Sequence, residues 1–183
     1  MTQVDREFLE KVRALLEKTT GGRFEVRIYP GDDEVVWDVK RKLGSYCDVA
    51  GVRQYRDGTV EIYPAGHGET DELVWEADSP QKVEEETLAS LEDPRKWPEL
   101  RGRFPKTVAF LEGLKGMAER ASNTEGVNIE FWIGEGHYGY GAFLRGWEGM
   151  GEEVKLREVE RITRILMKCK EEERRIWKAV TKG

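Results

Sequence analysis

The chain has 183 residues, of which 38% are hydrophobic and 36% are charged, and its 30 basic and 36 acidic side chains give a formal net charge of −6. This length suffices for one domain with a substantial buried core. The excess of acidic residues argues against non-specific nucleic-acid binding, and no apolar run approaches the roughly 20 residues of a membrane-spanning helix. We therefore expect a single domain over residues 1–183, with a weak subdivision into 1–93 and 103–183 joined by a connector at 94–102.

Hydrophobic periodicity predicts one helix and a run of strands in the first half of the chain. Apolar residues recur every three or four positions from Val4 to Leu16, which indicates an amphipathic helix. Alternating apolar and β-branched residues follow, as is typical of strands. Asp57-Gly58 stands between two such runs and predicts a hairpin with a type I′ turn. The expected strands cover residues 23–29, 34–39, 46–55, 59–63 and 73–75.

The second half is expected to show the same order of helix and strand. Ser79-Pro80 is typical of a helix start, and Asp93-Pro94 ends that helix. Another helix begins near Pro105. The remaining elements are a strand at 127–133, a glycine-rich turn at 134–141, a returning strand at 142–147 and a long final helix at about 152–182.

These elements form two units, each a helix followed by strands. Such an order is typical of an α+β fold with an antiparallel sheet, helices packed on one face and, here, a long C-terminal helix. The two units resemble each other around Phe8-Leu9-Glu10 and Phe110-Leu111-Glu112, as duplicated helix–strand–strand repeats would. Amphipathic helices followed by strands also resemble each other by chance, and we favour that explanation.

Aromatic residues gather on or beside the predicted strands. Tyr29 and Trp132 lie opposite to the aliphatic residues of their strands, because successive side chains alternate between the two faces. If helices cover the aliphatic face, the aromatic face is free to bind a small flat ligand or a protein. A second hydrophobic layer is the structural alternative. The predicted ligand-binding residues are Tyr29, Trp37, Tyr63, Trp132, His137, Tyr138 and Tyr140.

Both histidines lie in glycine-rich segments and have a glutamate two residues away. His67 is followed by Glu69, and His137 is preceded by Glu135. Side chains at i and i+2 of an extended segment point the same way, and two imidazoles with two carboxylates could bind a divalent metal ion such as Zn²⁺ or Mn²⁺. An alternative function is therefore a metal-dependent hydrolase or nuclease that uses these four residues. Ordinary exposed loop residues are the simpler explanation.

The remaining features indicate little chemistry. No nucleophile motif and no phosphate-binding glycine loop occurs in a suitable context, so whether the protein is an enzyme stays open. Asp32-Asp33-Glu34 is typical of a turn. The acidic segment 69–99 would suit an inhibitor that mimics nucleic acid, although a solvated surface is the simpler explanation.

The combined pattern favours a binding protein that engages a small ligand or a protein partner through the aromatic face and the glycine–histidine loops. We expect a cytoplasmic location, because Cys47 and Cys169 suit a reducing compartment. Neither a membrane nor a nucleic acid is expected as a partner, and oligomerisation stays open. The scarcity of Asn and Gln beside many charged residues suggests a thermophile, and the size and lack of enzyme motifs would fit a phage accessory protein.

Overall fold

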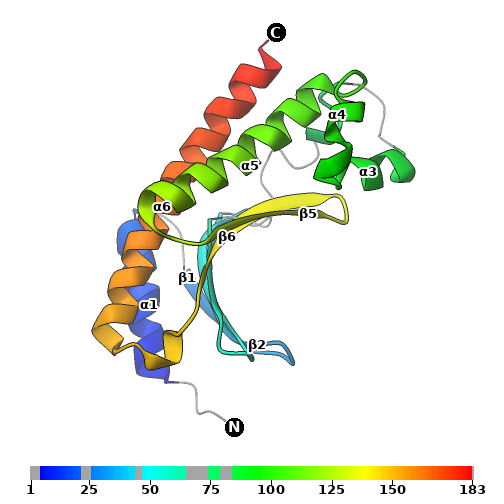
Figure 1. Ribbon diagram of the computed structural model, residues 1–183. Helices are drawn as coiled ribbons and strands as arrows, with labels where there is room; N and C mark the ends of the chain where they lie inside the picture. The colour runs from blue at the N-terminus through cyan, green and yellow to red at the C-terminus, as the bar shows by residue number, and fades with distance from the viewer. Residues whose placement is uncertain (1–4, 22–25, 44–46, 65–73, 79–83, 183) are drawn as a thin grey trace.

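The protein is described here by a computed structural model that covers residues 5–21, 26–43, 47–64, 74–78 and 84–182 (Figure 1). Its centre is a six-stranded sheet with the order β1-β2-β3-β4-β6-β5, and every neighbouring pair is antiparallel. The predicted α+β fold with an antiparallel sheet is thereby confirmed. The strands are β1 (Val26–Pro30), β2 (Val35–Leu43), β3 (Cys47–Tyr55), β4 (Val60–Tyr63), β5 (Ile129–Gly134) and β6 (His137–Leu144).

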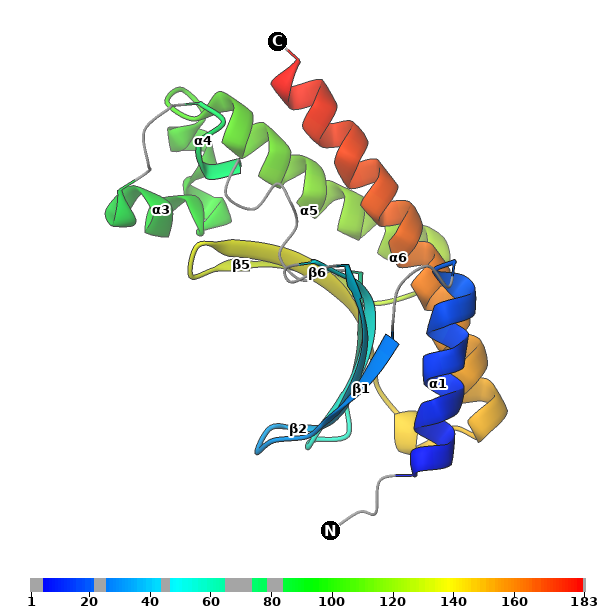
Figure 2. The ribbon, with the colours of Figure 1, turned by 180° about the vertical axis from the view of Figure 1, so that it is seen from behind.

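Three long helices cover one face of the sheet, as the sequence predicts. They are α1 (Arg6–Thr19), α5 (Pro105–Glu125) and α6 (Glu152–Thr181). Helix α1 packs on β1 and β2, α5 packs on β5, and α6 contacts β4 and both other helices. The sheet is strongly curved and these helices lie on its convex side (Figure 2). Within the described ranges, no helix crosses the concave side.

A row of apolar side chains across the sheet forms its contact surface with these helices. Consecutive members of the row are cross-strand neighbours, and all except the half-buried first member are buried. From one edge of the sheet to the other they are Ile28, Val39, Val52, Ile62, Ala142 and Ile129. Full burial of one such aliphatic side chain contributes about 1.5–3 kcal/mol. Helix α1 adds Leu9, Val12 and Leu16 from its inner face.

The segment between β4 and α5 is helical where the structure describes it. It contains α3 (Glu85–Leu91), η1 (Pro94–Lys96) and α4 (Trp97–Leu100). The expected strand at 73–75 is wrong for its two described residues, because Val74 and Trp75 form a helical turn. The indole of Trp75 is buried and donates a hydrogen bond to the carbonyl of Gly136, so a tertiary contact decides its conformation. None of the described helices is long and apolar enough to cross a membrane.

The two hairpins that carry glycine differ from the expected turn types. Asp57-Gly58 does join β3 to β4, but within this pair only Gly58 has a positive φ, of 91°, so the turn is not type I′. The N–H of Gly58 donates to the carbonyl of Tyr55 at 3.0 Å, which is typical of a three-residue loop closed by a left-handed glycine. In the predicted 134–141 turn, only Glu135 and Gly136 turn, with φ of 53° and 78°. Strand β6 therefore already begins at His137.

Candidate functional site

The concave face carries a second row of side chains, which we call the concave row. Its members are Tyr29, Asp38, Arg53, Glu61 and Phe143, which are cross-strand neighbours from β1 to β6. Each directly precedes or follows a member of the buried apolar row, and side chains alternate between faces. The row therefore points away from the helices. Its centre is charged, which is unusual for positions that are this far from the rim of the sheet.

Asp38 is the centre of a polar network in this row and is only 9% exposed. Its carboxylate accepts hydrogen bonds from the Tyr63 hydroxyl at 2.6 Å and from the Arg53 guanidinium at 3.2 Å. The Lys40 ammonium lies 3.7 Å away. The guanidinium also lies over the Tyr63 ring, 4.6 Å from its centre. Buried charges of this kind are tolerated because they are paired and hydrogen-bonded.

A second pair extends the network towards β6. The Tyr55 hydroxyl donates to the Glu61 carboxylate at 2.6 Å. Burial, together with Glu61, raises the pKa of Tyr55 to about 12. Burial and the Asp38 charge likewise raise the pKa of Tyr63 above its ordinary value. Both phenols therefore stay protonated at neutral pH and serve as fixed donors to the two carboxylates.

Glycines on the concave face are covered by side chains of the chain itself. A Cβ added to Gly51 would lie 2.1 Å from the Tyr63 ring, and one on Gly139 would lie 2.5 Å from the Trp132 indole. One on Gly141 would lie 2.9 Å from the Glu61 carboxylate. These glycines therefore make room for rings and carboxylates to approach the sheet closely. Trp132 remains 46% exposed in this position.

The structure divides the predicted ligand-binding residues between the two faces. Tyr29, Tyr63 and Trp132 lie on the concave face, and the exposed His137 begins β6 on the same side. The expectation of a free aromatic face is wrong for Trp37, Tyr138 and Tyr140, which are buried on the helix-covered face. The reason is strand alternation: Trp37 stands two residues from Val39, and Tyr140 stands two residues from Ala142.

Two of the four predicted metal ligands, His67 and Glu69, lie outside the described residues. Glu135 occupies the left-handed turn and His137 the strand after it, so the extended geometry assumed for this pair does not apply. The described ranges contain no group of three His, Cys, Asp or Glu residues that could hold a metal ion. The turn between β5 and β6 has a structural role, because the N–H of Gly136 donates a hydrogen bond to the Glu92 carboxylate at 2.8 Å.

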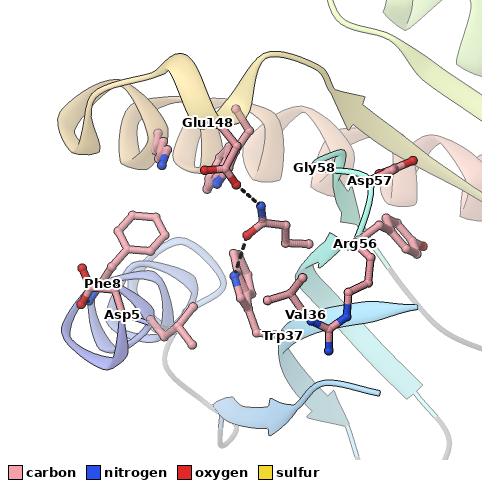
Figure 3. A pocket seen from close by; sticks show the side chains of 13 residues that line it. Asp5, Phe8, Val36, Trp37, Arg56, Asp57, Gly58 and Glu148 are labelled. Atoms are coloured by element: carbon pink, nitrogen blue, oxygen red, sulfur yellow. Dashed lines mark hydrogen bonds between the residues drawn. The ribbon is translucent and has the colours of Figure 1, made fainter. Parts of the chain in front are cut away.

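A pocket of about 390 Å³ opens at the end of the sheet where α1 and α6 begin (Figure 3). It lies between the first turn of α1, the ends of β2 and β3, and the short helix η2 (Trp147–Gly149). Sequence analysis singled out Trp37 as a strand residue but missed the cavity, because five separate segments form it. The lining residues that matter below are Phe8, Trp37, Gln54, Trp147, Glu148 and Lys155.

Comparison with known proteins gives no further guide to these sites: no family model, no curated protein and no solved structure matches the chain. The functional assignment therefore depends on the geometry and chemistry of the residues described above.

Proposed function

We propose that the protein is a binding module whose concave sheet face takes a small molecule with a flat ring and polar substituents. The observation that carries this proposal is the exposed indole of Trp132, which covers Gly139. A large exposed aromatic ring with a fixed orientation is a stacking platform for another ring. The glycine at position 139 leaves the space that the ring occupies in the absence of a ligand.

The polar groups beside Trp132 supply the specificity of such a site. Gly139 and Gly141 are successive concave positions of β6, about 7 Å apart along the strand. Trp132 covers the first and the Glu61 carboxylate approaches the second. A ring stacked on the indole would therefore place its substituents beside Glu61. Because the Tyr55 hydroxyl holds that carboxylate, its oxygen is oriented before a ligand arrives.

The charge of this face favours a small molecule over a nucleic acid as the partner. Glu130 lies directly opposite Gly141 in the β5–β6 pair, on the same side as Glu61. Two carboxylates next to a stacking ring repel a phosphate backbone. The proposed ligand class is therefore a neutral or cationic ring system with hydrogen-bond donors that the two carboxylates can accept.

Replacing Trp132 with alanine is expected to weaken ring binding by about tenfold or more, since base–aromatic stacking contributes about 1–3 kcal/mol. Adenosine, riboflavin and quinoline are suitable probes, with calorimetry as the readout because it does not depend on indole fluorescence. Val154 is the matched control, since it is also a large exposed hydrophobic residue but lies on α6. Val154→Ala should leave the affinity unchanged. The proposal fails if no probe binds below about 1 mM or if Trp132→Ala binds as tightly as the wild type.

A further inference from the structure

The pocket at the end of the sheet contains the ammonium group of Lys155, for which the described residues provide no counter-ion. The Lys155 ammonium lies 5.2 Å from the ring centre of Trp147 and 5.7 Å from that of Phe8. The side chain is half-buried. Among the residues that the structure describes, no carboxylate oxygen lies within 4.0 Å of this ammonium, although most other half-buried charges here are paired. Two ring faces partly replace its water, but they provide no charge to balance it.

The carboxylates of the pocket are engaged elsewhere. Asp5 accepts the N–H of Phe8 as the N-cap of α1, and Asp57 accepts the N–H of Thr59 in the β3–β4 turn. Glu148 accepts a hydrogen bond from the Gln54 amide. All three are exposed. Counting charges alone, three carboxylates against Lys155 and Arg56 would favour a cationic ligand, but each carboxylate already has a donor, whereas Lys155 faces the cavity with no anion.

The wall beside Lys155 is aromatic. Phe8, Trp37 and Trp147 contact one another with ring centres 6.0–6.5 Å apart. The Trp37 indole N–H is satisfied by the Gln54 carbonyl oxygen at 2.9 Å. Gln54 is hydrogen-bonded to both Trp37 and Glu148, and Figure 3 draws these two bonds as dashed lines. Both ends of the amide are therefore hydrogen-bonded, and the three rings offer the wall an apolar surface that suits a ring.

We propose that this pocket binds a small organic anion, a carboxylate attached to an aromatic body, with the carboxylate paired to Lys155. The volume of about 390 Å³ lies within the range of small-molecule sites, 300–1,000 Å³. The site is distinct from the concave row and shares only the Tyr55 side chain with its network. The two proposals therefore stand or fall separately.

Three probes with the same ring and different charge test the proposal: indole-3-acetate, the neutral indole-3-acetamide and the cationic tryptamine. Calorimetry on the Trp132→Ala variant, which lacks the stacking ring proposed for the concave face, should show the acetate binding at least about tenfold more tightly than either of the others, because a hydrogen bond between charged groups is worth more than its neutral counterpart. The proposal is overturned if tryptamine binds as tightly as the acetate, or if none of the three binds.

Substitutions then locate the site. Lys155→Met removes the charge but retains an unbranched side chain only one atom shorter. It should weaken indole-3-acetate binding by about tenfold or more, while Lys155→Arg should preserve it. Lys168→Met makes the same change at an exposed position of α6 and should have no effect. Thermal melting checks that each variant is folded. If Trp132→Ala rather than Lys155→Met removes acetate binding, the anion lies on the concave face and the pocket assignment is wrong.

Discussion

Replacing Gly51 with alanine is expected to lower the free energy of unfolding by about 2–4 kcal/mol. The added Cβ would lie 2.1 Å from Cζ of Tyr63 and 2.3 Å from its hydroxyl oxygen. The ring cannot deform, so it must leave the sheet. Its departure removes the 2.6 Å hydrogen bond to Asp38 and the contact with the Arg53 guanidinium. A buried carboxylate would then lose one of its donors, which is costly in a low-dielectric site.

Urea denaturation of two further variants separates this explanation from a general intolerance of alanine. Gly102→Ala adds a Cβ where no atom lies within 4 Å and should change stability by less than about 0.5 kcal/mol. In a Tyr63→Leu background the clash is relieved, so Gly51→Ala should cost less than in the wild type. Equal costs in both backgrounds would show that Tyr63 is not the obstacle. Gly51→Ala should also lower the affinity of the concave face for its ligand, because it disrupts the polar network around Asp38.

The two-residue alternation of the strands is what made the fold predictable. Ile28, Val39 and Ile62 stand at alternating positions among polar residues, and the structure places all three on the helix-covered face. Helix positions followed in the same way from the apolar spacing of α1 and α6. Local pattern suffices here because each element buries one face whatever its neighbour is.

The prediction placed Tyr138 and Tyr140 on the wrong face because the alternation rule was not applied to them. Tyr138, Tyr140 and Ala142 alternate with glycines in β6, so the glycine positions face the concave side and the tyrosines face the core. The prediction treated residues 134–141 as a turn and therefore did not apply strand alternation there. The alternation of tyrosine and glycine was present in the sequence, but it predicts the two faces only when the turn is confined to Glu135 and Gly136.

Contacts that depend on register were beyond sequence reasoning. Tyr63 lies on Gly51 because β3 and β4 pair in one particular alignment, and a shift of one residue would place the ring elsewhere. The pocket has the same property, since it joins Phe8, Trp37 and Trp147 from three distant segments. No local pattern specifies which elements meet at that end of the sheet.

Replacing Phe110 with alanine is expected to be the most destabilising of these changes, at about 3–5 kcal/mol. Phe110 is completely buried in α5. Its ring makes edge-to-face contacts with Tyr138 at 5.6 Å and with Trp177 at 5.2 Å, so it joins α5 to both β6 and α6. Truncation leaves a cavity where three elements meet, and rigid elements cannot close around it.

Comparing Phe110→Ala with Gly51→Ala separates effects on stability from effects on binding. Phe110 lies on the helix-covered side of the sheet. Phe110→Ala should therefore lower the urea concentration at the midpoint of unfolding, yet leave the affinity of the folded protein for ring probes unchanged. Gly51→Ala should change both quantities. Phe110→Leu retains most of the volume and should fall between Phe110→Ala and the wild type. If Phe110→Ala also abolished probe binding, the convex core would control the shape of the concave face, and the helices would be part of the binding machinery rather than only its support.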